Sequence, residues 1–211
     1  MQKIAWEISW DAEHLERRSL QWGTAKNQNV DDQTEASGAR SMNTGSKDKI
    51  LSGDGSHLTT AEQRLRQLGI KLPAPPEPFG IYAEAVQTGN LLFLTGMLPT
   101  VGREAKFIGR IGAELDLQTG RMAAYLAAVN ALAVARQHLG SLDKVSRVVR
   151  LGVLVATSGD VREQPKIADG ASELLQNVFD KDKNPSRLVY GVASLPLGVP
   201  VELELIFEVS A

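Results

Sequence analysis

The C-terminal segment, residues 199–209, places the strongest constraint on the fold of this chain. Val201, Leu203, Leu205 and Phe207 alternate there with Glu202, Glu204, Ile206 and Glu208. Because successive side chains of a strand point to opposite faces of a sheet, this alternation predicts a strand with one apolar and one wetter face. The chain therefore has to build a sheet and to cover its apolar face with other elements.

Two segments have the helical periodicity that such a cover requires. Apolar residues recur at spacings of three and four across residues 120–139, with alanines between them and Gly140 at the end. A second helix is predicted for residues 164–179, with Pro165 acceptable in its first turn. The alanine-rich face of the first helix allows close packing on a sheet.

The remaining elements complete an α+β pattern. Strands are predicted at residues 82–88, 91–98, 145–156, 187–193 and 199–209, with a shorter one at 106–111. A capping box of Thr60 and Gln63 begins a leading helix that ends at Gly69. We expect a sandwich in which two helices cover one face of a mixed sheet. The other face also needs cover, for which we expect another copy of the chain.

Residues 1–58 differ in composition from residues 59–211. The first 60 residues hold 7 Lys+Arg and 9 Asp+Glu, which accounts for the whole net charge of −2 (7 minus 9), and they hold all three tryptophans. Residues 23–57 are mostly polar and glycine-rich, so we predict that this leader is disordered. It is either an aromatic docking segment for a partner or a non-native upstream extension, and we favour the second interpretation.

Composition excludes several classes of function. The 211 residues contain no cysteine, so disulfides, cysteine nucleophiles and cysteine-based metal sites are excluded. The slightly acidic balance argues against a nucleic-acid partner, and no apolar stretch is long enough to span a membrane. The N-terminus resembles neither a signal nor a transit peptide, so we expect a cytoplasmic protein. With three histidines and no metal motif, we expect no metal site.

Arg187 and Glu202 are the candidate functional pair. Arg187 begins an otherwise apolar strand and offers planar donors that suit a carboxylate, while Glu202 lies in a neighbouring strand and can order or deprotonate a water. The alternative is an ordinary cross-strand ion pair, worth under about 1 kcal/mol if exposed. Spacing alone favours that alternative.

Three segments resemble one known family. The segments are residues 90–99 with Thr95-Gly-Met-Leu-Pro99, residues 186–196 with Arg187 eight residues before Leu195-Pro196, and residues 199–204 with Val201-Glu-Leu-Glu204. Together they are similar to the Rid (reactive intermediate deaminase) family, also called YjgF or L-PSP endoribonuclease-like, and within it to the long subgroup. The resemblance covers residues 61–211 and none of residues 1–58.

This resemblance implies a chorismate-mutase-like fold and a homotrimer in which three sheets form a central β-barrel, with a cleft between each pair of subunits. It also implies cofactor-independent hydrolysis of enamines and imines of 2-amino acids to 2-keto acids and ammonia. Arg187 matches the residue that binds the substrate carboxylate, and Glu202 matches the residue that positions the attacking water. Tyr82 and Thr95 match further residues of the cleft.

Two positions depart from the family pattern. Val189 stands where shorter relatives carry a cysteine, and Asp169 stands near a position that is often asparagine. An additional carboxylate in the cleft would repel an anionic substrate.

Two hypotheses follow from the resemblance, namely the imine deaminase and a non-catalytic module that binds a small carboxylate. A ribonuclease, which the older family name suggests, is disfavoured by the neutral domain. Both small-molecule hypotheses need Arg187 and Glu202 to share one pocket completed by a neighbouring subunit. We expect both hypotheses to fail if the two side chains point to opposite faces of the sheet.

Overall fold

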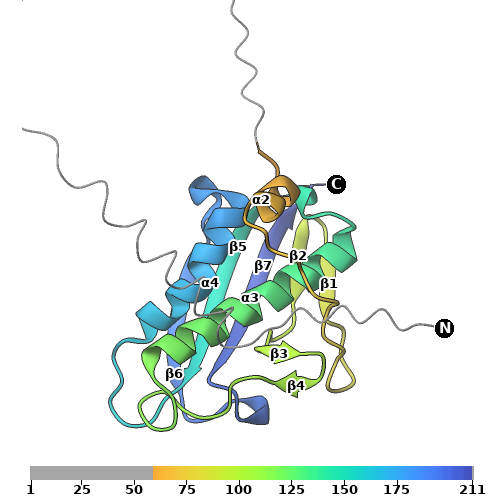
Figure 1. The fold of residues 1–211 in the computed structure, drawn as a ribbon. Helices are drawn as coiled ribbons and strands as arrows, with labels where there is room; N and C mark the ends of the chain where they lie inside the picture. Colours follow the sequence, from red (N-terminus) through yellow and green to blue (C-terminus); the bar gives the residue numbers. More distant parts are fainter. Residues whose placement is uncertain (1–58, 211) are drawn as a thin grey trace, which may run out of the picture. The chain divides into compact units, whose positions relative to one another are not determined.

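The computed structural model describes residues 59–210, and the predicted leader at 1–58 lies outside them. The described chain forms helices α2, α3 and α4 and strands β1 to β7 (Figure 1). The bounds of the helices are α2 Ala61–Gln67, α3 Leu117–Leu139 and α4 Gln164–Phe179. The bounds of the strands are β1 Ala85–Thr88, β2 Leu91–Leu94, β3 Thr100–Val101, β4 Glu104–Ala105, β5 Val145–Ala156, β6 Ser186–Val192 and β7 Val201–Val209.

Five of the strands form one mixed sheet in the order β1-β2-β7-β5-β6. The pairs β1–β2, β2–β7 and β7–β5 are antiparallel, whereas β5 and β6 are parallel and are connected through α4. Strands β3 and β4 form a separate two-residue hairpin. The sheet therefore has β1 and β6 as its two edges.

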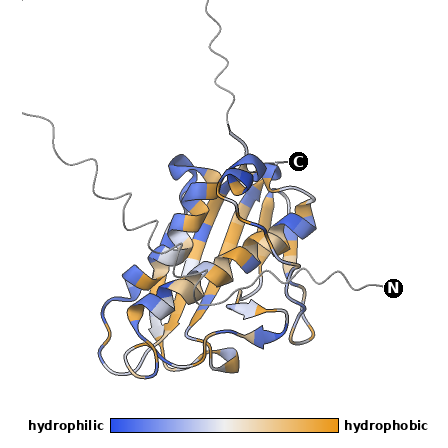
Figure 2. Cartoon of the chain, in the orientation of Figure 1, coloured by the Kyte–Doolittle hydropathy of each residue, from blue (hydrophilic) through white to orange (hydrophobic). Residues whose placement is uncertain are grey.

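Helices α3 and α4 lie across one face of this sheet, and α2 packs against α4 (Figure 1). This arrangement confirms the α+β class and the two-helix cover. Asp116 caps the start of α3 by accepting a hydrogen bond from the Thr119 N–H at 2.7 Å, and Gly140 ends the helix with a φ of 81°. Figure 2 shows hydrophobic residues concentrated in the strands and along α3. The core lies between these layers, as the buried Leu126, Leu151 and Phe207 illustrate.

A buried asparagine connects α3 to the segment after β2. The Asn130 Nδ2 donates to the carbonyl oxygens of Leu98 and Thr100, each at 2.9 Å. Asn130 is only 2% exposed, so these bonds satisfy donors that would otherwise lose hydration without compensation. The contact fixes the end of the Thr95–Pro99 motif against the helical layer.

The second face of the sheet carries no helix of the described chain. Its outward-facing residues include exposed apolar side chains, which are Val86, Phe93, Leu188 and Tyr190. Exposed apolar groups gathered on one sheet face are typical of a surface that another molecule covers. We call this surface the open face. The three-sheet barrel remains a prediction, because the structure describes one chain.

Three of the predicted strands differ from the observed ones. The strand predicted at 82–88 begins only at Ala85, so Tyr82 lies outside it. Residues 106–111 are not a strand, because the chain turns at Gly102 (φ 57°) to form the β3–β4 hairpin earlier than expected. The strand predicted at 91–98 ends at Leu94 and resumes only as a bridge between Met97 and Leu203. The interruption at Thr95 and Gly96 makes room for the side chain of Glu202.

The helical layer depends on the absence of a side chain at Gly170 in α4. A Cβ at this position would overlap the backbone carbonyl oxygen of Arg121 in α3, whereas a Cβ at Gly120 would meet the flexible Ile111 Cδ1 at 2.8 Å. Alanine normally stabilises a helix interior by about 1 kcal/mol relative to glycine. At Gly170 we expect the opposite sign.

We predict that Gly170→Ala lowers the free energy of unfolding by about 1–3 kcal/mol through this overlap. Gly120→Ala is the control, and we expect a smaller loss because Ile111 has alternative rotamers. Urea denaturation followed by circular dichroism measures both changes. A Gly170→Ala variant as stable as the wild type would show that α3 and α4 do not require this close approach.

Candidate functional site

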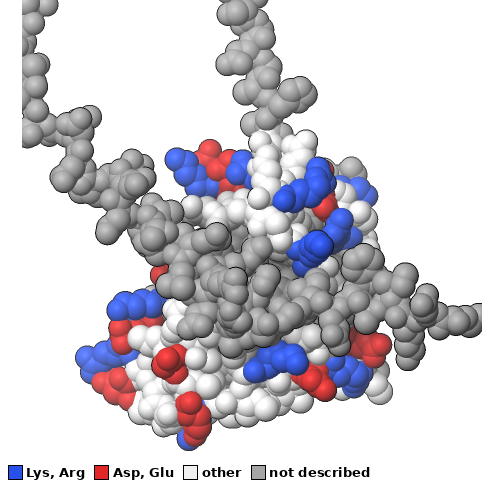
Figure 3. Space-filling view, in the orientation of Figure 1, with Lys and Arg blue, Asp and Glu red and all other residues white. Residues whose placement is uncertain are grey.

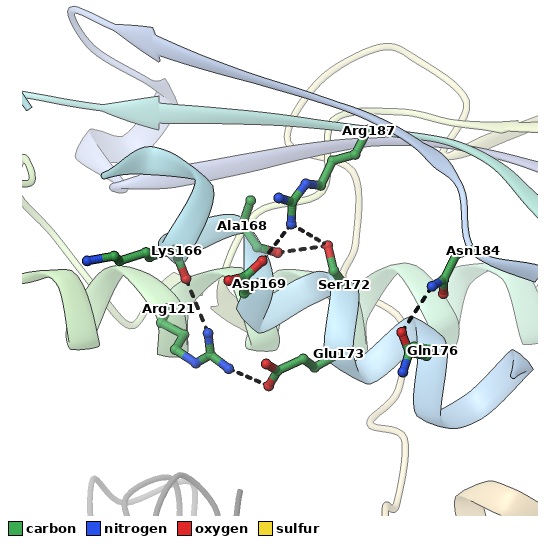
Figure 4. A network of polar contacts seen from close by, with 9 residues as sticks. All are labelled: Arg121, Lys166, Ala168, Asp169, Ser172, Glu173, Gln176, Asn184 and Arg187. Atoms are coloured by element: carbon green, nitrogen blue, oxygen red, sulfur yellow. Dashed lines mark hydrogen bonds and ion pairs between the residues drawn. The ribbon is translucent and has the colours of Figure 1, made fainter. Parts of the chain in front are cut away.

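Arg187 lies at the start of β6, and its side chain points toward α4. Its Nη1 donates to the Asp169 Oδ1 at 2.8 Å and to the Ser172 Oγ at 3.0 Å, and both partners belong to α4 (Figure 4). The Ser172 hydroxyl in turn donates to the carbonyl oxygen of Ala168 at 3.2 Å. The Arg187 side chain is 29% exposed. These contacts orient the guanidinium at the β6 edge of the sheet.

Only one nitrogen of the Arg187 fork is occupied in this network. Within residues 59–210, Nε and Nη2 have no hydrogen-bond partner. These two donors form the side of the guanidinium that matches a carboxylate bidentately. Arg187 can therefore bind a small carboxylate through Nε and Nη2 while Nη1 remains hydrogen-bonded to α4.

Glu202 lies in β7, and its carboxylate rests against the backbone of Gly96. A Cβ at Gly96 would overlap the Glu202 Oε1, so the glycine provides the space that this carboxylate occupies. Among the described residues Glu202 has no hydrogen bond or ion pair. Burial without a counter-charge raises the pKa of the Glu202 carboxyl above its ordinary value, because desolvation disfavours the charged form. An unpaired, partly buried carboxylate of this kind is suited to hold a water molecule or to exchange a proton with a substrate.

Arg187 and Glu202 leave the sheet on opposite faces. Strand β5 lies between their strands, with Leu151 opposite Arg187 and Leu154 opposite Glu202. Residues three apart in a strand point to opposite faces, and this part of the β5–β7 ladder has no irregularity. Arg187 therefore faces the helices and Glu202 the open face. The ion-pair interpretation is therefore wrong, and the two side chains do not face one pocket within a single chain. Only a site that combines Arg187 of one copy with Glu202 of another would bring them together.

Thr95 groups with Glu202, whereas Tyr82 lies elsewhere. Thr95 precedes Gly96, and its N–H donates to the Glu84 carbonyl at 2.9 Å. Tyr82 is exposed in the segment before β1, and its hydroxyl accepts a hydrogen bond from the Phe79 N–H at 2.9 Å. Because β1 and β6 are opposite edges of a five-stranded sheet, about 19 Å separates the Tyr82 edge from the Arg187 edge.

Two residues near the candidate groups, Ser172 and Tyr190, were not predicted from the sequence. Ser172 shares the Arg187 Nη1 with Asp169, and its place one helical turn after Asp169 is the signal that was available. Tyr190 lies in the same row as Leu154 and Glu202 on the open face and is exposed. Its position three residues after Arg187 already placed it on the opposite face.

The visible charged surface has no extended region of one sign. Figure 3 shows basic and acidic side chains next to each other over the helical face wherever described residues are visible. Many of these charges are paired, as in Arg110–Glu114 and Lys166–Glu163. This part of the described surface lacks the basic groove that binds a nucleic-acid backbone.

Comparisons with known proteins agree with the fold. A family model described as YjgF/chorismate mutase-like, with endoribonuclease as a provisional activity, matches residues 62–209. The protein TCP17 of Trypanosoma cruzi is 37% identical over 147 residues, covering 69% of this chain and 92% of the relative. The chain belongs to the Rid (YjgF) family.

Other relatives of this Rid protein have more specific names or solved structures. A 2-iminobutanoate/2-iminopropanoate deaminase of Dermatophagoides farinae is 31% identical over 138 residues, covering 65% of this chain and 92% of the relative. The protein Atu1372 of Agrobacterium tumefaciens, of unknown function, superimposes with a TM-score of 0.66 at 34% identity. That match covers 71% of this chain and 92% of the Atu1372 chain.

The elevated pKa of Glu202 predicts a pH-dependent stability difference. A carboxyl whose pKa is higher in the folded state binds more protons there, so its ionisation costs stability as pH rises through that range. We predict that Glu202→Gln is more stable than the wild type at about pH 7.5 and gains nothing at about pH 3, where both states are protonated.

Urea denaturation at the two pH values measures this difference. Glu204→Gln removes an acid from the same face of the same strand, but it also breaks the Arg150–Glu204 pair at 3.3 Å, so it should not stabilise the protein. An equal gain for Glu202→Gln at both pH values would contradict the assigned cause.

Proposed function

We propose that this protein hydrolyses the reactive imines of 2-amino acids to 2-keto acids and ammonia. The observation that carries the proposal is an arginine with an open carboxylate-binding side and a separate unpaired glutamate, in a family that includes a named 2-iminobutanoate/2-iminopropanoate deaminase. The reaction needs few groups. Imines hydrolyse readily, so a site that fixes the substrate and presents a water supplies most of the required catalysis.

Each group has a defined part in this chemistry. The Arg187 Nε and Nη2 bind the substrate carboxylate, which fixes the adjacent C=N carbon. Glu202 holds a water and accepts its proton as the oxygen bonds to that carbon. The C–N bond then breaks, the nitrogen leaves as ammonia after protonation, and the carbon becomes the keto group. Atoms balance with one imine and one water consumed.

Because Arg187 and Glu202 face opposite ways, this proposal needs each site to combine residues from two copies of the chain. Arg187 is at the β6 edge, while Glu202 lies on the exposed apolar face that needs a cover. We propose that the β6 edge of one copy meets the open face of the next within a homotrimer. Arg187 of one subunit and Glu202 of its neighbour then form one cleft.

We predict that Arg187→Ala lowers kcat/KM for 2-iminobutanoate about 100-fold, mainly by raising KM, because a bidentate charged contact is lost. Ammonia release from freshly generated imine measures this change after subtraction of the spontaneous rate. Arg121→Ala is the matched control, since Arg121 is bonded to Glu173 and does not contact Arg187. Equal enzymatic rates for wild type and Arg187→Ala would refute the proposal.

Complementation tests the two-copy site. Arg187→Ala and Glu202→Gln chains are each expected to be nearly inactive, but co-expressed chains should regain about a quarter of the sites by random mixing in a ring. A site within one chain would regain none, because every chain carries one defect. Size-exclusion chromatography with light scattering checks that the mixed protein is a trimer.

One observation favours a second candidate function. Asp169 already neutralises part of the charge of Arg187, which suits reversible binding of a small carboxylate by a non-catalytic module. Calorimetric binding of 2-oxobutanoate without turnover of any imine would support that module. The ribonuclease alternative has no basic groove on the visible described surface to support it.

A further inference from the structure

The contact between Asp169 and Arg187 has a consequence for substrate choice, which rests on the proposed function. Asp169 and Ser172 hold Nη1, while Nε and Nη2 remain for a carboxylate (Figure 4). The guanidinium therefore has donors for one carboxylate. Its charge of +1 is balanced by Asp169 at 2.8 Å before any substrate arrives.

No unpaired cation accompanies Arg187 among the described neighbours on α3 and α4. Arg121 is paired with Glu173, and it also donates to the Lys166 carbonyl at 3.2 Å. Lys166 is paired with Glu163 at 2.6 Å. A substrate with a second carboxylate would bring two negative charges to a pair whose net charge is zero. Its second carboxylate would meet the like charge of Asp169 without a partner of its own.

We propose that Asp169 is a specificity-determining residue that restricts the site to 2-imino acids with uncharged side chains. Substrates with an acidic side chain, such as the imines of aspartate and glutamate, are rejected by electrostatic repulsion. A 2-imino acid is only a few bonds long, so both of its carboxylates lie within the range over which like charges repel in a partly buried site. The exposed fractions of the Arg187 and Asp169 side chains are 29% and 41%, so solvent and salt reach the pair and the repulsion should weaken as the salt concentration rises.

This role differs from a purely positioning one in a measurable way. If Asp169 only oriented Arg187, its removal would change kcat/KM for both substrate classes by the same factor. If Asp169 instead repels a second carboxylate, a role that we call a charge filter, its removal changes the ratio of the two kcat/KM values. Asp169→Asn isolates the charge, because its amide oxygen can still accept the hydrogen bond from Nη1.

The experiment compares kcat/KM for 2-iminopropanoate and iminosuccinate, which are the imines of alanine and aspartate. We expect the wild type to prefer 2-iminopropanoate, and Asp169→Asn to reduce that preference at least about tenfold through a lower KM for iminosuccinate. Asp180→Asn is the matched control, because it removes an equal charge at the C-terminal end of the same helix, eleven residues from Asp169 (180 minus 169), where the carboxylate is bonded to Arg64 of α2 instead. It should leave the ratio unchanged.

An unchanged ratio in Asp169→Asn would overturn the inference, as would an equal shift in Asp180→Asn. Failure of the proposed function is recognised separately. If the wild type accelerates neither imine, the same ratio is measured as calorimetric affinities for pyruvate and oxaloacetate, the corresponding keto acids. A selective gain of oxaloacetate binding in Asp169→Asn then supports the charge filter without catalysis, and the absence of such a gain refutes it.

Discussion

Strand β5 is the element on which the rest of this structure depends. It is hydrogen-bonded to β6 on one side and to β7 on the other, so its register decides which residues of those strands share a face. Leu151 places Arg187 on the helical side, and Leu154 places Glu202 on the open side. A shift of one residue in either ladder would reverse the orientation of one of these groups.

In the proposed mechanism, this division makes association with another copy part of the chemistry. A single chain presents one arginine at an edge and one carboxylate on an exposed, partly apolar face, and neither is a complete site alone. The same apolar surface that needs cover also carries Glu202. Burial of that surface and assembly of the site would therefore occur in one step, which links stability of the oligomer to activity.

The two charged groups obtain their properties in different ways. Contacts with one helix orient Arg187, since Asp169 and Ser172 are neighbours on α4 and share one nitrogen. Burial shifts the protonation equilibrium of Glu202, because Gly96 allows the carboxylate to lie against the backbone with no hydrogen-bonding partner within residues 59–210. The polar contacts of Arg187 leave one side of its guanidinium free to bind a carboxylate. Burial without any polar contact raises the pKa of the Glu202 carboxyl.

Sequence alone determined the class of this fold, the bounds of α4 and β5, and the outward position of Glu202 in β7. Those features follow from periodicity and capping, which act over a few residues. The family motifs also identified Arg187 and Glu202 as a pair. Only the tertiary structure decided that Asp169 bonds Arg187, that Gly96 makes room for Glu202, and that the pair faces opposite ways. Each of these depends on contacts between segments far apart in the chain. Alternation within one strand shows which of its residues share a face, but it does not name the residues of another strand or helix that lie opposite them.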